Sequence, residues 1–168
     1  MARNIEIKAR VADLSALQTR AQAISNKGAQ VLQQEDVFFH VEHGRLKLRK
    51  QTPGPNQLVY YERPDQSGPK QSFYLLATVQ DTDGLEQVLT AALGVRGVVR
   101  KRRTLYWVGQ TRIHLDEVEG LGTFLELEVM LEETQKEEEG VEIAKNLMKQ
   151  LGVREEDLLE GAYLDLAK

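Results

Sequence analysis

Apolar and polar side chains alternate along several segments of this chain. In residues 3–11, Ile5, Ile7 and Ala9 fall on one side, and the side chains between them are polar. Alternation with a period of two predicts a β-strand. Other alternating or apolar segments, separated by turn residues such as the pair Gly109–Gln110, predict further strands. The predicted strands are 3–11, 29–42, 45–49, 57–63, 70–78, 97–108, 111–117 and 122–131.

Three other segments carry helix signals. Asp13 is a residue type that caps helices, and the glycines Gly28, Gly94 and Gly152 stand where helices are expected to end. The predicted helices cover residues 13–27, 81–93 and 134–151. The tail 160–168 is short and could add a last strand.

Eight strands joined mostly by short turns predict antiparallel pairing. Eight antiparallel strands in one small domain can close into a barrel, which removes the exposed sheet edges. We therefore predict the α+β class, with an eight-stranded antiparallel β-barrel, flanking helices and one domain over residues 1–168.

Composition narrows the class of protein. The chain has 168 residues, with 22 Lys and Arg against 26 Asp and Glu, and a net charge of −4, which argues against nucleic-acid binding. Cysteine is absent, which excludes disulfides, thiolate metal ligands and a cysteine nucleophile. No apolar run approaches the ~20 residues of a membrane span, and the N-terminus lacks the apolar core of a signal peptide. A cytoplasmic protein is expected.

The polar faces of several predicted strands are charged, and the charges segregate by sign. Residues 95–113 contain six basic residues and no acid, whereas residues 116–142 contain eleven acids and one lysine. One interpretation is an ordinary sheet with a solvated face. The other is that the charged faces line the inside of the barrel, where carboxylates and cations offset each other's desolvation and meet a polyanion with its metal.

The residue types suit that second interpretation. Carboxylates such as Glu6, Asp116, Glu126 and Glu128 are hard oxygen ligands that match Mg²⁺ or Mn²⁺. Arginine and lysine bind phosphate oxygens, arginine often through two hydrogen bonds. The three histidines have no metal-ligand spacing; His114 shares the charged face and is interpreted as a hydrogen-bonding residue.

Four motifs in order resemble the CYTH superfamily, also called triphosphate tunnel metalloenzymes. Residues 4–8 stand where that family has Glu-x-Glu-x-Lys, and residues 101–109 look like its Lys-x-Arg strand and hairpin. Residues 113–128 are similar to its acidic hairpin joined by Leu-Gly, and residues 161–166 to its C-terminal Tyr motif. The resemblance covers about residues 3–166 and looks closest to the class IV adenylyl cyclase-like branch, whose relatives include thiamine triphosphatases and tripolyphosphatases.

The resemblance implies a barrel that forms a tunnel. It implies metal ligands at Glu6, Glu126 and Glu128, with Asp116 as a ligand or near neighbour. It implies catalytic roles for Lys8, Glu126 and Glu128, with Lys8 helping to deprotonate the nucleophile. The residues implied to bind the triphosphate are Lys8, Lys47, Arg49, Arg63, Lys101, Arg103 and Arg112.

Three departures from the family pattern bear on mechanism. Asn4 replaces the first motif glutamate, which removes a charged ligand. The sequence therefore does not decide whether the site binds one metal ion or two. Phe38 falls where many tripolyphosphatase-like members carry a tyrosine thought to help activate water. Glu62 falls near a lysine position of some cyclases, where the neighbouring Arg63 is a candidate replacement.

The resulting hypothesis is a hydrolase that depends on Mg²⁺ or Mn²⁺ and acts on the triphosphate of inorganic tripolyphosphate, thiamine triphosphate or nucleoside triphosphates. One alternative is a class IV-type adenylyl cyclase that makes cyclic AMP and pyrophosphate from ATP. Others are a non-catalytic polyphosphate-binding module and a structural barrel whose charged faces meet water. The expected partner is a small molecule with a triphosphate, with neither nucleic acid nor membrane, and the expected state is a monomer or homodimer.

Overall fold

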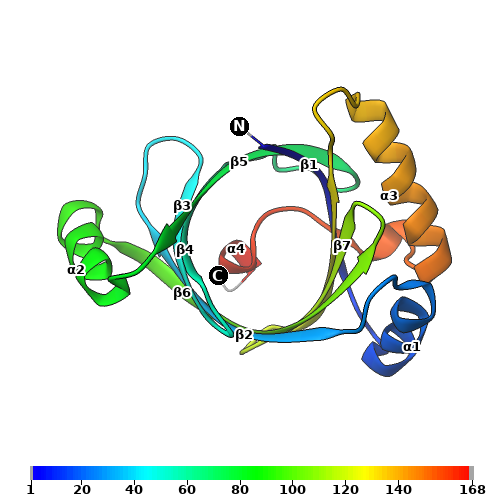
Figure 1. The fold of residues 1–168 in the computed structure, drawn as a ribbon, viewed down its shortest axis with the longest axis horizontal. Coiled ribbons are helices and arrows are strands. Elements are labelled where there is room, and N and C mark those ends of the chain that lie inside the picture. The colour runs from blue at the N-terminus through cyan, green and yellow to red at the C-terminus, as the bar shows by residue number, and fades with distance from the viewer. Residues whose placement is uncertain (1, 167–168) are drawn as a thin grey trace.

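Eight strands form a closed barrel in the computed structural model, which describes residues 2–166 (Figure 1). They are β1 (Ala2–Arg10), β2 (Gln30–Phe39), β3 (Arg45–Thr52), β4 (Asn56–Glu62), β5 (Lys70–Val79), β6 (Val95–Val108), β7 (Thr111–Val118) and β8 (Gly122–Met130). They follow the order β5-β4-β3-β2-β6-β7-β8-β1, and an antiparallel pairing of β1 with β5 closes the ring. Every pairing is antiparallel. The predicted fold class is confirmed.

Three helices flank the barrel, as predicted. Two of them, α1 (Leu14–Ile24) and α3 (Glu137–Leu151), cover one side, and α2 (Thr82–Leu93) lies on the opposite side (Figure 1). Asp13 caps α1 by accepting a hydrogen bond from the Ala16 backbone N–H at 3.0 Å. Gly152 ends α3 in the left-handed conformation, with φ 72°. None of the helices within residues 2–166 is long and apolar enough to cross a membrane.

The apolar face of the strands points outward, beneath α1 and α3. Ile113 and Leu127 are fully buried there and pack in one cluster with Leu147 of α3. Burying a side chain of this size contributes about 1.5–3 kcal/mol. The helix approaches closely because Gly140 has no side chain, and a Cβ there would lie 2.5 Å from Cγ1 of Ile5. The largest hydrophobic cluster therefore lies outside the barrel, which leaves much of the inward face free for charge. A smaller apolar cluster on the inward face, which includes Phe38, Val99 and Phe124, packs against Tyr163 of the tail.

The C-terminal tail turns into the barrel. A 3₁₀ helix (Glu155–Asp157) and a two-residue strand β9 (Leu158–Leu159), paired with β1, lead to the short helix α4 (Tyr163–Leu166). Figure 1 shows α4 inside the ring of strands. The expectation of a last strand over 160–168 is thus wrong for residues 163–166, and residues 167–168 lie outside the described residues. Gly161, with φ 82°, turns the chain inward, where side chains rather than a neighbouring strand bind its carbonyl.

Candidate active site

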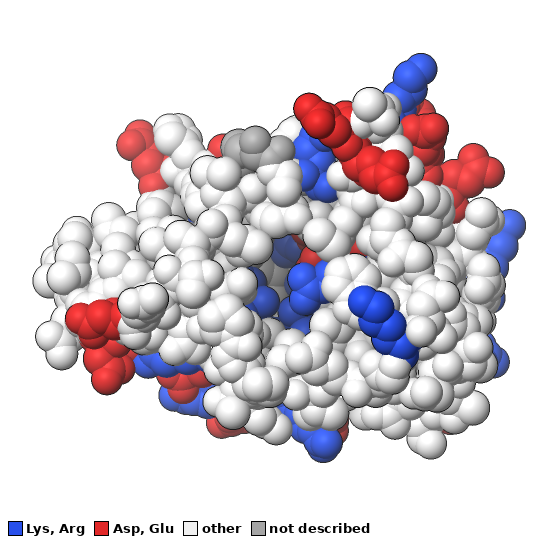
Figure 2. Space-filling model, in the orientation of Figure 1, with Lys and Arg blue, Asp and Glu red and all other residues white. Residues whose placement is uncertain are grey.

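Alternate residues of the barrel strands line an internal cavity of about 300 Å³. Figure 2 shows its opening, with lysine and arginine atoms at the mouth and carboxylate atoms deeper inside. Seven cationic and four anionic side chains line it, an excess of three positive charges. The charged faces therefore point inward, as the second interpretation of the sequence required. These charged residues are Lys8, Lys47, Arg49, Arg63, Lys101, Arg103, Arg112, Glu6, Asp36, Glu126 and Glu128.

The structure brings ten of the eleven predicted site residues to this one cavity. The exception is Asp116, which does not belong to the lining. It is fully buried and accepts hydrogen bonds from Arg103 Nε and Nη2, each at 2.8 Å, and from the Tyr163 hydroxyl at 2.7 Å. Both carboxylate oxygens thus have protein partners. In this arrangement Asp116 orients Arg103 and anchors the tail.

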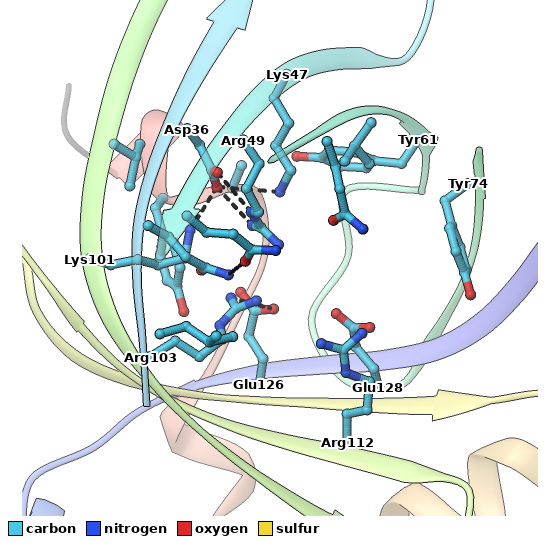
Figure 3. Close-up of a pocket in the computed structure, with 18 of the residues that line it drawn as sticks. Asp36, Lys47, Arg49, Tyr61, Tyr74, Lys101, Arg103, Arg112, Glu126 and Glu128 are labelled. Carbon is cyan, nitrogen blue, oxygen red and sulfur yellow. Dashed lines mark hydrogen bonds and ion pairs between the residues drawn. The ribbon is translucent and has the colours of Figure 1, made fainter. Parts of the chain in front are cut away.

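One wall of the cavity, formed by β2, β3 and β6, carries three cations around a single carboxylate (Figure 3). Asp36, 1% exposed, accepts hydrogen bonds from Arg49 Nε and Nη2, each at 2.8 Å, and from Lys101 Nζ at 2.7 Å. Lys47 Nζ lies 3.5 Å from the same carboxylate. We call Asp36, Lys47, Arg49 and Lys101 the cation cluster. It holds an anion-binding surface in place before any ligand arrives.

Burial and the neighbouring charges shift the pKa values of the side chains in the cation cluster. Burial raises the pKa of Asp36, but Arg49, Lys101 and Lys47 outweigh it and hold that pKa well below its usual value. Burial and the neighbouring Arg49 lower the pKa of Lys47 to about 7, against the attraction of Asp36. Burial also lowers the pKa of Lys101.

Asp36 is the residue of this cluster that the sequence analysis did not single out. Its only signal is its place on the inward face of β2, between the polar Gln34 and the apolar Phe38. That pattern does not distinguish a functional carboxylate from a solvated one. The pairing of β2 with β3 and β6 places Asp36 beside Arg49 and Lys101, and only this contact reveals its role.

A second group of contacts ties β1 to the C-terminal tail. Glu6 accepts hydrogen bonds from Arg63 Nη1 at 2.9 Å and from the Ser72 hydroxyl at 2.6 Å. Arg63 Nη2 and Lys8 Nζ both donate to the Gly161 carbonyl, at 2.8 and 3.1 Å. Lys8 and Arg63 therefore hold the tail against the cavity wall.

Lys8 is the most enclosed of the predicted catalytic groups. Its Nζ lies 4.0 Å from the centre of the Tyr163 ring and 3.5 Å from Oε1 of Glu126. Burial lowers its pKa to about 8, although Glu126 acts in the opposite direction.

The opposite wall, formed by β7 and β8, holds the carboxylate pair. Glu126 and Glu128 project into the cavity from one face of β8, and Arg112 reaches the same region from β7 (Figure 3). One ligand atom each from His114, Glu126 and Glu128 lies within 4.8 Å of the others. We call these three residues the acidic triad. Two carboxylates and an imidazole form a donor set that fits a divalent cation.

Burial supports this fit. His114 is fully buried, and neither of its ring nitrogens has a hydrogen-bond partner among residues 2–166. Burial and the nearby Arg103 lower its pKa. Asn4 donates from Nδ2 to Glu128 at 3.5 Å, while its buried Oδ1 has no partner among the described residues. The predicted ligand Glu6 also lines the cavity but is engaged by Arg63.

Comparison with known proteins assigns this geometry to a family. The model of the CYTH domain matches residues 2–163, so the chain belongs to the CYTH domain family. Members of this family are metal-dependent enzymes of triphosphatase or cyclase type. The resemblance read from the four motifs is confirmed.

Individual relatives agree in sequence and fold. A protein of Methanocaldococcus jannaschii named "Putative adenylate cyclase MJ0240" is 25% identical over 170 residues, 96% of this chain and 97% of that protein. The PH1012 protein of Pyrococcus horikoshii OT3 is 30% identical, with TM-score 0.85 over 98% of this chain and 99% of that one. A Hippeastrum protein, 19% identical with TM-score 0.62 over 95% and 91% of the two chains, shares the fold.

Proposed function

We propose that this protein is a divalent-metal-dependent triphosphatase that binds a triphosphate inside the barrel. The observation that carries the proposal is the excess of three positive charges in an enclosed cavity that also holds a carboxylate pair. An enclosed cavity strengthens each ionic contact with a polyanion because water screens it less. The cavity volume is near the lower end of the range for ligand sites, which favours inorganic tripolyphosphate as the substrate.

Opposite walls would hold different parts of the substrate. The cation cluster presents Lys47, Arg49 and Lys101, and Arg103 follows Lys101 on the same face of β6. Arg112 approaches from β7 in the opposite wall (Figure 3). These groups bind phosphate oxygens, align the chain and stabilise the charge that develops as the phosphoryl group is transferred. Asp36 and Asp116 keep Arg49 and Arg103 in fixed orientations before the substrate arrives.

The two carboxylates of the acidic triad, Glu126 and Glu128, are the proposed site of the cation, Mg²⁺ or Mn²⁺. A bound divalent cation neutralises phosphate oxygens and orients the attacking water. Lys8 lies between Glu126 and the tail, where its amine can hold or take the proton that the water loses. This role of Lys8 does not need the tyrosine hydroxyl that Phe38 replaces.

Adenylyl cyclase activity is the second candidate, and the name of the Methanocaldococcus relative favours it. In that reaction the ribose 3′-hydroxyl attacks the α-phosphorus of ATP and pyrophosphate leaves. The same lysines and arginines would bind the phosphates. The leaving pyrophosphate would lie at the opposite end of the triphosphate from the orthophosphate that hydrolysis releases. The Hippeastrum protein is described as a "Putative adenylyl cyclase" that "reveals a dominant triphophatase activity", so one protein of this fold carries both descriptions.

Product analysis separates these candidates. The purified protein is incubated with tripolyphosphate, thiamine triphosphate or ATP, each with Mg²⁺ and with Mn²⁺, and the products are resolved by chromatography. Orthophosphate without cyclic AMP supports the triphosphatase. Cyclic AMP and pyrophosphate from ATP would establish the cyclase instead. Binding of tripolyphosphate by thermal shift without any product would indicate a non-catalytic binding module; saturation at 100 times Kd stabilises a protein by about 2.7 kcal/mol.

A further inference from the structure

His114 is a buried polar side chain without an evident function in the barrel wall. It is fully buried, and neither ring nitrogen has a hydrogen-bond partner among the described residues. Leaving a buried polar group unsatisfied costs about 1–3 kcal/mol, so native proteins seldom retain one without a reason. A leucine or phenylalanine would fill the same space without this cost.

The ring faces the two carboxylates of β8. Its Nδ1 lies 3.7 Å from Oε2 of Glu126 and 3.6 Å from Oε1 of Glu128. Both separations are longer than a hydrogen bond. Ligands of a divalent ion with bonds of about 2.1 Å lie about 3 to 3.4 Å apart. The two nitrogen–oxygen pairs are therefore within a few tenths of an ångström of that spacing, and all three ligand atoms lie within 4.8 Å of one another.

The backbone holds this arrangement in place. His114 on β7 is the direct antiparallel partner of Glu126 on β8, and Glu128 is the next residue on the same face. The carboxylates reach the cavity, with side chains 13% and 21% exposed, while the imidazole lies behind them. An ion entering from the cavity would therefore meet the carboxylates first and the nitrogen last.

Asn4 adds a second reason for another ligand in this site. It stands in β1 where the resembling family carries the first glutamate of its motif, and it provides no charge. Its Nδ2 lies 3.5 Å from Glu128, and its buried Oδ1 has no partner within residues 2–166. Three buried atoms, His114 Nδ1 and Nε2 and Asn4 Oδ1, thus have no hydrogen-bond partner among the described residues, and both residues contact Glu128.

We propose that His114 is a nitrogen ligand of the catalytic cation, together with Glu126 and Glu128, and that it makes the site select a transition-metal ion such as Mn²⁺ over Mg²⁺. The inference rests on the proposed function only in taking the bound ion to be the catalytic one. Mg²⁺ prefers an all-oxygen shell, whereas an imidazole nitrogen is a favourable ligand for first-row transition ions. The imidazole nitrogen therefore favours Mn²⁺ over Mg²⁺, whereas the two carboxylates alone would bind either ion.

Electron paramagnetic resonance of bound Mn²⁺ tests this ligand directly. The protein is titrated with MnCl₂, with and without tripolyphosphate, and pulsed measurements detect nitrogen-14 coupled to the ion. We expect coupling from a directly bound imidazole in the natural chain. It should disappear in His114→Phe, with Mn²⁺ binding weakened about tenfold or more. Mg²⁺ affinity is read by competition in the same titration and should fall less.

Two further variants guard against indirect effects. His114→Asp replaces nitrogen by oxygen, so it should retain a bound ion, lose the nitrogen coupling and shift the Mn²⁺-to-Mg²⁺ preference toward Mg²⁺. His43→Gln alters an exposed histidine and should leave coupling and affinity unchanged. Thermal melts without metal show whether each variant is folded. If His114→Phe is unfolded, the nitrogen coupling and the metal preference are tested with His114→Asp alone.

The outcomes separate this inference from the proposed function. Bound Mn²⁺ without nitrogen coupling in the natural chain, or no Mn²⁺ binding with and without tripolyphosphate, would overturn the role of His114. A Mn²⁺-to-Mg²⁺ preference unchanged in His114→Asp would overturn the selectivity. Nitrogen coupling in a protein that releases no orthophosphate from any triphosphate would leave the ligand assignment intact and overturn the triphosphatase.

Discussion

The two walls of the cavity are built on opposite plans. In the cation cluster on β2, β3 and β6, one buried carboxylate contacts three cations, and Asp36 has a partner for each oxygen. In the acidic triad on β7 and β8, two carboxylates face an imidazole whose nitrogens have no hydrogen-bond partner among residues 2–166. The first wall is complete without a ligand and the second is not.

This difference indicates what each wall does. A wall with its own counterion is a preassembled receptor, in which an arriving anion competes with Asp36 for the same cations. A wall whose carboxylate oxygens and imidazole nitrogen lack partners is stabilised most by an added cation, which those atoms can bind. Substrate and metal would therefore approach one cavity through complementary surfaces, and substitutions should affect the two walls in different ways.

The largest effect on stability is expected from Asp36→Asn. The change leaves Lys47, Arg49 and Lys101 close together without their buried counterion. Removing one partner of a buried ion pair costs about 3–5 kcal/mol. Denaturant unfolding measures the loss, and the loss should shrink when tripolyphosphate is present because the anion supplies the missing charge. A loss that tripolyphosphate leaves unchanged would contradict the receptor role of this wall.

The largest effect on activity is expected from Glu126→Gln in the other wall. The neutral amide keeps the shape but removes one of two anionic donors of the acidic triad. We expect tripolyphosphate turnover to fall about 10²–10³-fold, the usual loss when one group that stabilises the transition state is removed. Steady-state kinetics with saturating metal measures it. The exposed Glu117→Gln, on the outer face of β7, is the matched control, and full activity in Glu126→Gln would refute the site assignment.

A smaller effect is expected from Tyr163→Phe, which links the tail to the barrel. It removes the hydroxyl that donates to Asp116 at 2.7 Å but keeps the ring next to Lys8 and Phe124. Hydrogen bonds to charged groups contribute about 1.5–3 kcal/mol, so the free energy of unfolding should fall by about that amount or less. Thermal and denaturant melts measure the change. An unchanged stability would mean that this contact does not anchor the tail.

The smallest effect concerns a single proton in the cation cluster. Because the pKa of Lys47 is about 7 in the free protein, most of this side chain is neutral at pH 8. A bound polyanion favours the charged form, so tripolyphosphate binding at pH 8 should take up close to one proton, and less at pH 6, where Lys47 is already charged. Calorimetry in buffers of different ionisation enthalpy measures the uptake. Lys47→Met should lower the uptake by close to one proton, and any remainder is expected from Lys8, whose pKa is about 8. An uptake that this variant leaves unchanged would assign it to another group.

Much of the fold could be predicted because it follows from local rules. Alternation in β1, β3 and β7 shows which side chains share a face, and short turns such as Gly109–Gln110 require antiparallel neighbours. Boundaries were less certain: the helix predicted over 13–27 ends at Ile24, and the strand predicted over 29–42 ends at Phe39. The C-terminal tail could not be placed, because the Gly161 carbonyl just before its four-residue helix is held by Lys8 and Arg63, which are distant in the sequence.

The sequence by itself determined which residue types lie on the inward face and in which order the strands that carry them follow along the chain. Residue type and a period of two are local properties, and together with the resemblance to the CYTH family they named ten residues that share one cavity. Only the tertiary structure decided which charges meet. Strand register sets Asp36 against Arg49 and Lys101, turns Asp116 toward Arg103, and places His114 beside Glu126. Register between β2 and β6 depends on pairing between segments far apart in the chain. In the hairpins β2–β3, β6–β7 and β7–β8 it depends on the geometry of the turn, which residue type and alternation do not give.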